Sequence, residues 1–388
     1  MKVLQGVRIL DLGNFITAPL AGMLLGELGA DVIKVERPGA GDPFRAFKGG
    51  LYSPQFQAHN RNKRSLSLDY ACPQGLAVLD RLVAGADAII LNMRPGVEEK
   101  LGLGAPRLQA LNPRLVYCAI TGFGASGPYA SRPAYDNVGQ AASGWLSMFH
   151  AGADPKVAGP AVSDAVAGIY ASLGILGALV ERARTGRGRK VEVSMLEAMI
   201  AMACEPLGSM LATGRAPSLY GRAAMSQSYV VTCRDDRRIG LHLSSPEKFW
   251  RGLAAAIDRP DLLAAYPSRA ERIERYAELA ATLAQVFAEH DREYWVPRLE
   301  RHDVPFTPER RLDELADDPQ VRHQGVFYEQ AHPRHGTLRA AHRPIRYDGD
   351  NRSDFLPPPD LGEHTDDVLR EAGLSDEELQ GLRQAGVV

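Results

Sequence analysis

The residue best suited to chemistry is Asp164, within the segment Pro160–Gly168. It stands at the beginning of a long apolar segment, Ala165–Val180, whose pattern predicts a buried helix. Because a helix N-terminus presents unpaired backbone N–H groups and a partial positive charge, we expect the Asp164 carboxylate to be ionised and able to act as a nucleophile. The alternative is an ordinary N-cap, since aspartate is a preferred capping residue.

Basic and small residues follow several predicted strands. Arg37 comes after the second strand, the segment 62–64 (Asn-Lys-Arg) precedes the third, and the segment 92–96 (Asn-Met-Arg-Pro-Gly) follows the fourth. Most exposed Arg and Lys residues are only solvated charges. Gathered at the carboxyl edge of one sheet, however, they indicate a phosphorylated ligand.

Other motifs predict less. The segment Gly122–Gly127 matches the G-x-G-x-x-G dinucleotide fingerprint, but Pro128 and Pro133 disfavour the helix that the fingerprint must open, so we expect a glycine-rich loop lining a site. His332 and His335 could be a metal pair, yet no further ligand cluster lies near them in sequence; we expect a surface loop and no metal. No Gly-x-Ser-x-Gly elbow is present.

The first 120 residues alternate strand and helix patterns, which is typical of parallel strands joined by crossover helices. The sequence therefore predicts an α/β fold with a doubly wound, Rossmann-like large domain, in which ligands bind beyond the carboxyl ends of the strands. The expected strands are Val7–Leu10, Val32–Val35, Ser65–Leu68, Ala88–Leu91, Leu115–Ile120 and Val191–Ser194, and the expected early helices are Ala18–Leu28, Pro73–Gly85 and Ala105–Leu111.

Composition excludes several classes of partner. The 388 residues carry a formal net charge of −2 with acidic and basic residues intermixed, so we expect neither nucleic acid nor a membrane surface as a partner. The four cysteines form no Cys-x-x-Cys pair, and residues 1–10 lack the features of a signal peptide; both point to the cytoplasm. The apolar run 166–180 is short for a membrane span and is expected to be a core helix.

Taken together, seven segments resemble the class III CoA-transferases of the CaiB/BaiF type, which include formyl-CoA and carnitine CoA-transferases and are related to the α-methylacyl-CoA racemases. The resemblance covers nearly the whole chain. The segments are Gly6–Asp11, Leu28–Arg37, Asn62–Ser65, Gly122–Gly124, Arg132–Asp136, Thr185–Gly188 and Leu361–Thr365.

The resemblance implies an intertwined homodimer, with Asp164 as the catalytic residue and CoA or acyl-CoA as a substrate. Lys100 stands at a position where the resemblance leads us to expect arginine, and a lysine offers a point charge instead of bidentate phosphate pairing. The CoA-binding residues implied by the resemblance are Phe15, Ile16, Arg37, Leu68, Asp69, Tyr70, Ala71, Asn92, Met93, Arg94, Lys100, Arg132, Pro133, Ala134 and Tyr135.

The predicted domain organisation combines the patterns with the resemblance. Residues 1–211 form the N-terminal part of the large CoA-binding domain, and residues 212–228 a linker. Residues 229–310 form a smaller α+β domain, 311–350 a second linker, and 351–388 a C-terminal segment that returns to the large domain.

The activity that the resemblance implies is transfer of CoA from an acyl-CoA donor to a small carboxylic acid. Asp164 would pass through an aspartyl anhydride and an aspartyl-CoA thioester. We expect the oxyanions to be bound by backbone N–H groups of the glycine-bearing loop and of the turn at Asp164. The donor and the acceptor do not follow from the sequence.

Two alternatives remain open at this stage. A 2-methylacyl-CoA racemase must remove and return an α-proton, but relatives with that activity carry histidine where Tyr135 stands, and tyrosine of normal pKa is a poor base at neutral pH. A CoA-binding protein without turnover would not need Asp164. The segment 220–229 lacks the glycine run of the formyl-CoA transferases; its Arg222, Gln227 and Tyr229 could contact an acceptor carboxylate or be ordinary polar surface.

Overall fold

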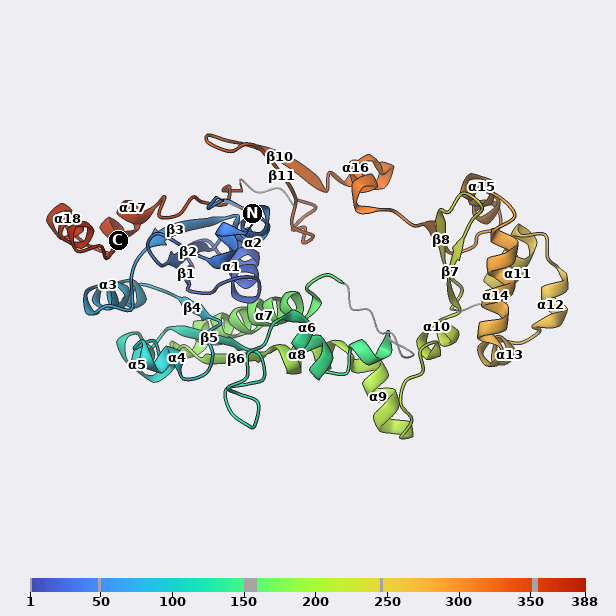
Figure 1. Cartoon of the computed structure of the whole chain (residues 1–388), viewed down its shortest axis with the longest axis horizontal. Coiled ribbons are helices and arrows are strands. Elements are labelled where there is room, and N and C mark those ends of the chain that lie inside the picture. Colours follow the sequence, from blue (N-terminus) through green and yellow to red (C-terminus); the bar gives the residue numbers. More distant parts are fainter. Residues whose placement is uncertain (1, 48–49, 150–158, 245–246, 351–354) are drawn as a thin grey trace. The chain divides into compact units, whose positions relative to one another are not determined.

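A parallel sheet organises the first half of the chain. In the computed structural model, which describes residues 2–47, 50–149, 159–244, 247–350 and 355–388, six strands lie in the order β3-β2-β1-β4-β5-β6 (Figure 1). All neighbouring pairs in this sheet are parallel. The strands are β1 Arg8–Asp11, β2 Asp31–Glu36, β3 Lys63–Ser67, β4 Ala88–Leu91, β5 Val116–Thr121 and β6 Lys190–Ser194. The predicted α/β class is confirmed.

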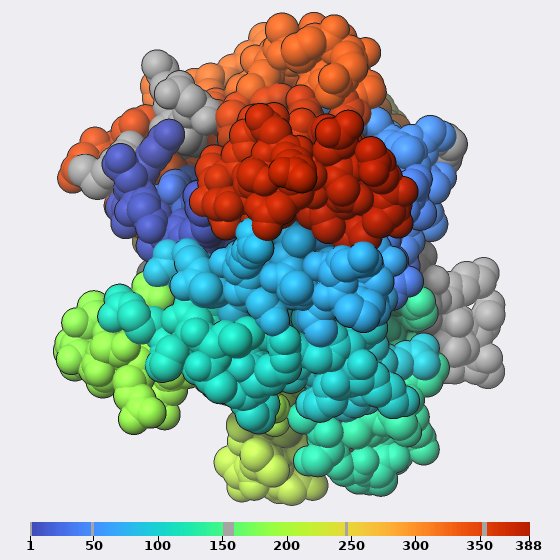
Figure 2. Space-filling view, turned by 90° about the vertical axis from the view of Figure 1, so that its left-hand side faces the viewer, coloured from blue at the N-terminus to red at the C-terminus, as the bar shows by residue number. Residues whose placement is uncertain are grey.

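Helices pack on both faces of this sheet, because successive strand residues point to opposite sides. Ile9 belongs to a core shared with α1 (Thr17–Glu27) and α7 (Val162–Thr185). Its neighbour Leu10 belongs to a second core, which includes residues of α3 (Pro73–Ala84), α17 (Thr365–Glu371) and α18 (Asp376–Gln384). Figure 2 shows the C-terminal residues (red) lying against the light-blue region that contains α3.

The edge strand β3 is covered by a segment from the far end of the chain. His364 donates its backbone N–H to the carbonyl oxygen of Ser65 at 3.0 Å, and its Nδ1 accepts the Ser65 N–H at 3.3 Å. Thr365 Oγ1 accepts the N–H of Ser67 at 3.0 Å. The segment Leu361–Thr365, which carries part of the family resemblance, therefore satisfies backbone groups that an edge strand would leave unpaired.

Helix α7 carries Asp164 in its first turn. It is long and apolar enough to cross a membrane by composition, but half of its most apolar window is buried in the chain. Ala167, Ala171 and Ile175 lie in the core with β1 and β4, as expected of a core helix. Its other face exposes Ile169, Leu173 and Val180, which are 53%, 61% and 65% accessible.

The chain divides into two compact units. Among the described residues, the first comprises those within 2–147, 159–203 and 325–388, and the second residues 148–149 and those within 204–324. The second has its own core beneath an antiparallel sheet in the order β7-β8-β9, formed by Ser228–Thr232, Arg238–His242 and Phe306–Pro308. The predicted domain boundaries at 211, 229 and 310 stay a prediction, and the one at 351 lies outside the described residues.

The remaining elements complete the two units. In the first unit they are η1 Pro43–Ala46, α2 Pro54–Asn60, α4 Val97–Lys100, α5 Ala105–Leu111, α6 Asp136–Ala142, α8 Met195–Met202 and the hairpin of β10 Phe327–His332 with β11 Gly336–Ala341, while η2 Leu146–Met148 contains the last residues of its first segment and the first residue of the second unit. In the second they are α9 Cys204–Thr213, α10 Gly221–Ser226, α11 Glu247–Ala256, α12 Asp261–Ala265, α13 Arg269–Glu274, α14 Tyr276–Phe287, α15 Arg292–Arg301, η3 Leu312–Asp317 and α16 Pro319–Gln324.

Candidate active site

Asp164 lines a pocket of about 170 Å³ that lies beyond the carboxyl ends of β1, β4 and β5. This is where ligands bind in open parallel sheets. The pocket brings together most of the residues that the sequence singled out. Its lining is Phe15, Ile16, Thr17, Asn92, Met93, Arg94, Pro95, Ile120, Thr121, Gly122, Ala130, Arg132, Ala134, Tyr135, Asp164 and Met195.

Asp164 is not the N-cap of its helix. Helix α7 begins at Val162 with Ala161 as the N-cap residue, and Ala161 makes no side-chain capping bond. The first turn is capped instead by Asp136, whose Oδ1 accepts the backbone N–H of Ser163 at 2.8 Å and that of Asp164 at 3.2 Å. The N-cap interpretation is therefore wrong, and the Asp164 side chain is left for the pocket.

The Asp164 carboxyl is surrounded by groups that favour its neutral form. Burial and, second, the neighbouring Asp136 charge raise the pKa of Asp164 to about 7. The sequence led us to expect a fully ionised group, because a helix N-terminus favours negative charge. Here Asp136 occupies the first N–H groups of that terminus, so near neutral pH the Asp164 side chain is divided between its two protonation states.

Asp136 is the important residue that the sequence reasoning missed. It is the first residue of α6, and its Oδ2 accepts the side-chain amide of Gln140 at 2.5 Å. The only signal was its place at the end of the Arg132–Asp136 segment, next to Tyr135. Capping of a helix that begins 26 residues later is a tertiary contact, which local sequence does not show.

Two guanidinium groups line the same pocket. Arg94 and Arg132 make no ion pair with any acidic residue in the described parts of the chain, and Arg132 lies over the Tyr129 ring, 3.8 Å from its centre. Unpaired arginines in a concave site suit a phosphate or carboxylate ligand. This charge agrees with the phosphorylated ligand expected from the sequence.

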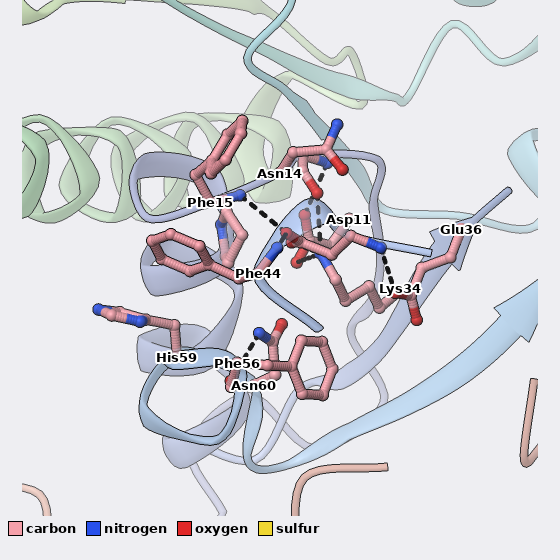
Figure 3. Close-up of polar contacts among 12 residues, drawn as sticks. Asp11, Asn14, Phe15, Lys34, Glu36, Phe44, Phe56, His59 and Asn60 are labelled. Carbon is pink, nitrogen blue, oxygen red and sulfur yellow. Dashed lines mark hydrogen bonds and ion pairs between the residues drawn. The ribbon is translucent and has the colours of Figure 1, made fainter. Parts of the chain in front are cut away.

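The pocket wall formed by Gly13–Ile16 has an unusual backbone. Phe15 adopts a φ of +63°, a left-handed conformation that costs a bulky residue about 1–3 kcal/mol. Beneath this loop lie fully buried charges (Figure 3): Lys34 Nζ is 3.0 Å from Asp42 Oδ2 and donates to the Gly13 carbonyl oxygen at 2.8 Å. Asp11 accepts from Lys63 Nζ at 2.8 Å. The buried charges thus support the wall of the pocket.

Asn92 is committed to the same loop. Its Oδ1 accepts the backbone N–H of Asn14 at 3.0 Å, and its Nδ2 donates to the Asn14 carbonyl oxygen at 2.7 Å and to Thr17 Oγ1 at 3.0 Å. The side chain therefore joins the carboxyl end of β4 to that of β1. Its predicted contact with CoA must be made alongside these bonds.

Seven predicted CoA-binding residues do not line the pocket. Leu68 and Tyr70 are buried in the hydrophobic core, and Arg37 lies within hydrogen-bonding distance of Tyr70. Lys100 ends the short helix α4 and is exposed. The role of these residues toward CoA stays a prediction; the full set is Arg37, Leu68, Asp69, Tyr70, Ala71, Lys100 and Pro133.

The glycine-rich loop after β5 lines the site only through Gly122. Between the end of β5 at Thr121 and the start of α6 at Asp136 the chain forms no helix, so the loop cannot present a helix N-terminus to a dinucleotide. The N–H of Gly124 donates to Thr121 Oγ1 at 2.9 Å, and the N–H groups of Ser163 and Asp164 donate to Asp136. These expected oxyanion donors are therefore already engaged within the chain.

His332 and His335 meet Asp360, with one ligand atom from each residue within 4.8 Å of the others. His332 is buried at the end of β10, so a plain surface loop was the wrong expectation for it. Its Nδ1 accepts the backbone N–H groups of Arg334 and His335, while Arg334 and His335 both pair with Asp360. A cation would have to displace these partners; the absence of a metal stays a prediction.

Residues 222–229 belong to the second unit. Gln227 and Tyr229 are buried, and the Tyr229 hydroxyl donates to Gln227 Oε1 at 3.1 Å. Arg222 is exposed and pairs with Glu205 at 2.8 Å. In this arrangement Gln227 and Tyr229 stabilise the fold of their own unit, and their proposed contact with an acceptor has no support from their bonding.

Comparison with known proteins matches this chain to CoA-transferases. The family model described as CoA-transferase family III matches residues 4–365. The chain is 32% identical over 396 residues to the succinyl-CoA:glutarate CoA-transferase of Homo sapiens, covering 100% of this chain and 90% of that protein. It is 31% identical over 417 residues to a formyl-CoA:oxalate CoA-transferase of Rhodopseudomonas palustris (strain BisA53), covering 100% and 97%.

Two solved structures resemble this chain over nearly its whole length. A CaiB/BaiF family protein from Brucella suis superposes with a TM-score of 0.83 at 29% identity, covering 95% of this chain and 99% of that one. A hypothetical protein from Mycobacterium tuberculosis superposes with a TM-score of 0.82 at 30% identity, with the same coverage.

Proposed function

Because the chain belongs to CoA-transferase family III, we propose that it moves CoA from an acyl-CoA donor to a free carboxylic acid, with Asp164 as the nucleophile. The observation that carries this proposal is the pocket itself. It places one partly buried aspartate of raised pKa together with two arginines that have no acidic partner among the described residues. A basic carboxylate suits attack on a thioester, and the arginines suit an anionic substrate.

The first half of the reaction loads CoA onto the protein. An Asp164 carboxylate oxygen attacks the thioester carbonyl carbon, the carbon–sulfur bond breaks, and an aspartyl acyl anhydride and CoA thiolate form. The thiolate then attacks the Asp164 side-chain carbonyl carbon. The anhydride bond breaks, leaving an aspartyl-CoA thioester and the donor as a free carboxylate.

The second half reverses these steps with another acid. The acceptor carboxylate attacks the aspartyl thioester and expels CoA thiolate, which attacks the acceptor's acyl carbon in the new anhydride. The acceptor leaves as its CoA thioester and Asp164 returns as a carboxylate. No net proton is taken up or released over the whole cycle, and Asp164 must start it as a carboxylate.

The environment of Asp164 supports this role. A carboxylate of higher pKa is more nucleophilic than an ordinary one, and at a pKa of about 7 much of it is still ionised at neutral pH. The charges of Arg94 and Arg132 favour the negative charge that develops in the pocket. We also propose that the large domain is doubly wound and Rossmann-like. The strand order β3-β2-β1-β4-β5-β6 supports this topology.

An intertwined homodimer is the second part of the proposal. Its support is the exposed face of α7, where Ile169, Leu173 and Val180 recur at helical spacing. Helix α9 likewise has no buried residue in the single chain. Apolar faces of this kind mark surfaces that associate. Multi-angle light scattering should give twice the chain mass of 42.1 kDa; a monomer at micromolar concentration would contradict the dimer.

Cytoplasmic location and an acceptor of small carboxylic acid class complete the proposal. The cysteines Cys72, Cys118, Cys204 and Cys233 are all free thiols, as suits a reducing compartment. The relatives named above act on succinyl-CoA with glutarate and on formyl-CoA with oxalate, so dicarboxylic acids are the first acceptors to test.

The racemase alternative predicts a different chemistry at the same pocket. It needs two proton-transfer groups on opposite faces of the substrate, and Tyr135 is the residue that would have to partner Asp164. Incubation with 2-methylacyl-CoA in D₂O separates the two: a racemase incorporates deuterium at the α-carbon without an acceptor acid, whereas a transferase does not.

The direct test is intact mass after brief exposure to a panel of acyl-CoAs, followed by peptide mapping. A CoA or acyl adduct on the Asp164 peptide is expected, and it should be absent from Asp164→Asn. A protein that binds CoA but forms no adduct and transfers no CoA with any donor would contradict the proposal.

A further inference from the structure

Phe15 combines a strained backbone with a place in the pocket. Glycine adopts a positive φ at no cost, whereas a phenylalanine held there requires surroundings that fix it. Residues strained in this way cluster at active sites and ligand-binding sites. Phe15 lines the pocket that contains Asp164, and its ring lies against that of Tyr135, another residue of the pocket wall.

Side chains from outside the segment, two of them distant in sequence, fix the backbone around Phe15. Gly13 donates its N–H to Asp11 Oδ1 at 2.9 Å, and Asn92 binds both the N–H and the carbonyl oxygen of Asn14. The N–H of Phe15 itself donates to Asp42 Oδ1 at 3.2 Å. Each of these partners lies outside the 13–15 segment, so the loop cannot relax without breaking a buried polar contact.

Asp42 sets the position of two aromatic rings at once. The same Oδ1 that accepts from Phe15 also accepts the N–H of Phe44 at 2.9 Å. The two rings meet edge to face with centres 5.3 Å apart. Figure 3 draws both rings next to each other. On its other side the Phe15 ring meets Tyr135 at 6.0 Å, also edge to face. Tyr135 is the N-cap residue of α6, whose first residue is Asp136.

From this geometry we propose that Phe15 limits the length of the acyl group that the pocket accepts, and that Asp42 is the positioning residue that holds the Phe15 ring in place. Because Phe15 belongs to the wall of the pocket that holds Asp164, its side chain takes up space that several methylene groups could fill. Lys34 fixes Asp42 in turn, because its Nζ pairs with the Asp42 carboxylate and also donates to the Gly13 carbonyl oxygen.

The proposal rests on the proposed function for its substrate class but is tested by binding alone. The probes are the unreactive thioethers S-propyl-CoA and S-hexyl-CoA, which have no carbonyl for Asp164 to attack. The measured quantity is the ratio of their dissociation constants, obtained by calorimetry. A merely structural defect would weaken both probes together and leave this ratio unchanged.

Phe15→Gly keeps the left-handed backbone without strain and removes the ring. It should shift the ratio toward S-hexyl-CoA by at least tenfold relative to the unaltered protein. Phe327→Ala, which removes an exposed ring on β10, is the matched control and should leave the ratio unchanged. An unchanged ratio in Phe15→Gly would overturn the assignment of Phe15.

The role of Asp42 is tested by a double substitution that leaves no buried charge unpaired. Lys34→Met with Asp42→Leu removes both partners and leaves Asp11 paired with Lys63, so the fold should tolerate it. This double variant should shift the ratio in the same direction as Phe15→Gly but less. Asp42→Asn retains an oxygen acceptor for the Phe15 N–H and should stay near the original ratio.

The outcomes separate the two proposals. A double variant with the original ratio would overturn the role of Asp42. A protein that binds both thioethers but transfers no CoA would contradict the proposed function while leaving the role of Phe15 intact. A protein that binds neither probe would contradict both.

Discussion

The Asp136 carboxylate accepts the backbone N–H of Asp164 at 3.2 Å while its charge helps to raise the pKa of the Asp164 side chain. One residue therefore both fixes the start of α7 and adjusts the acidity of its neighbour. The capping contact stabilises the helix, and the close negative charge opposes ionisation of the group proposed to react.

Asp136→Asn should move the acid limb of kcat/KM to lower pH by about 0.5–1.5 units, because the like charge beside Asp164 is lost while the capping oxygen remains. Burial, the larger cause of the raised pKa, is unchanged, so the shift is partial. The measurement is a pH–rate profile from pH 5 to 9. Asp303→Asn, on the surface of the second unit, should leave the profile in place; an unmoved limb in Asp136→Asn would contradict the coupling.

Asp164→Asn should lower kcat for CoA transfer by roughly 10⁴-fold or more, since the covalent path loses its nucleophile. CoA affinity should change little, because the amide keeps the size of the carboxyl. Calorimetric binding together with a coupled transfer assay checks both statements. Preserved turnover, with deamidation ruled out by mass, would contradict the mechanism.

Asp164→Asn should also stabilise the protein at alkaline pH. The folded chain holds the Asp164 proton with a pKa of about 7, against a usual value of 3.8, so folding takes up a proton between these values. Stability therefore falls as the pH rises from about 4 to 7. At pH 8 Asp164→Asn should raise the free energy of unfolding by roughly 1–3 kcal/mol in urea titrations, and at pH 4 it should have little effect. Equal effects at both pH values would contradict the raised pKa.

Arg132→Ala and Arg94→Ala should each weaken CoA binding by about tenfold, with smaller losses at high salt. Arg132→Lys should recover only part of the loss, because a lysine cannot make two parallel bonds. Arg339→Ala, on the exposed hairpin, is the control with the same change of charge. Equal affinities in all three alanine variants would show that the pocket arginines do not contact the substrate.

Lys34→Met alone should destabilise the first unit by about 3–5 kcal/mol, because Asp42 would be left buried without its ion pair. Urea denaturation measures this loss. The Lys34→Met/Asp42→Leu double variant should recover most of it. A double variant less stable than the single one would contradict the account of the buried charges.

The sequence was enough to predict much of the fold. Short apolar runs predicted the bounds of β1 to β5 to within one or two residues. This worked because strands that are buried on both faces are continuous apolar segments. The helix at Ala105–Leu111 was predicted with its observed bounds. The short helix α2 was missed, although Ser53 and Pro54 form a recognisable N-cap and first turn.

The site was predicted less completely than the fold. The residues that gather around Asp164 came from the resemblance together with the rule that sites lie at the carboxyl ends of strands. The role of Asp136 and the left-handed Phe15 depend on contacts between residues far apart in sequence. No local pattern encodes these contacts, so only the folded chain shows them.

The covering of β3 by Leu361–Thr365 has a consequence for synthesis on the ribosome. Ser65 and His364 are 299 residues apart, so at ~5–20 residues per second roughly 15–60 s pass between their translation. For that interval the nascent sheet has an open edge that could pair with another chain. Arg64 of β3, which pairs with Glu371 of α17 in the folded chain, places a charge on that edge, and a charged edge residue disfavours such pairing.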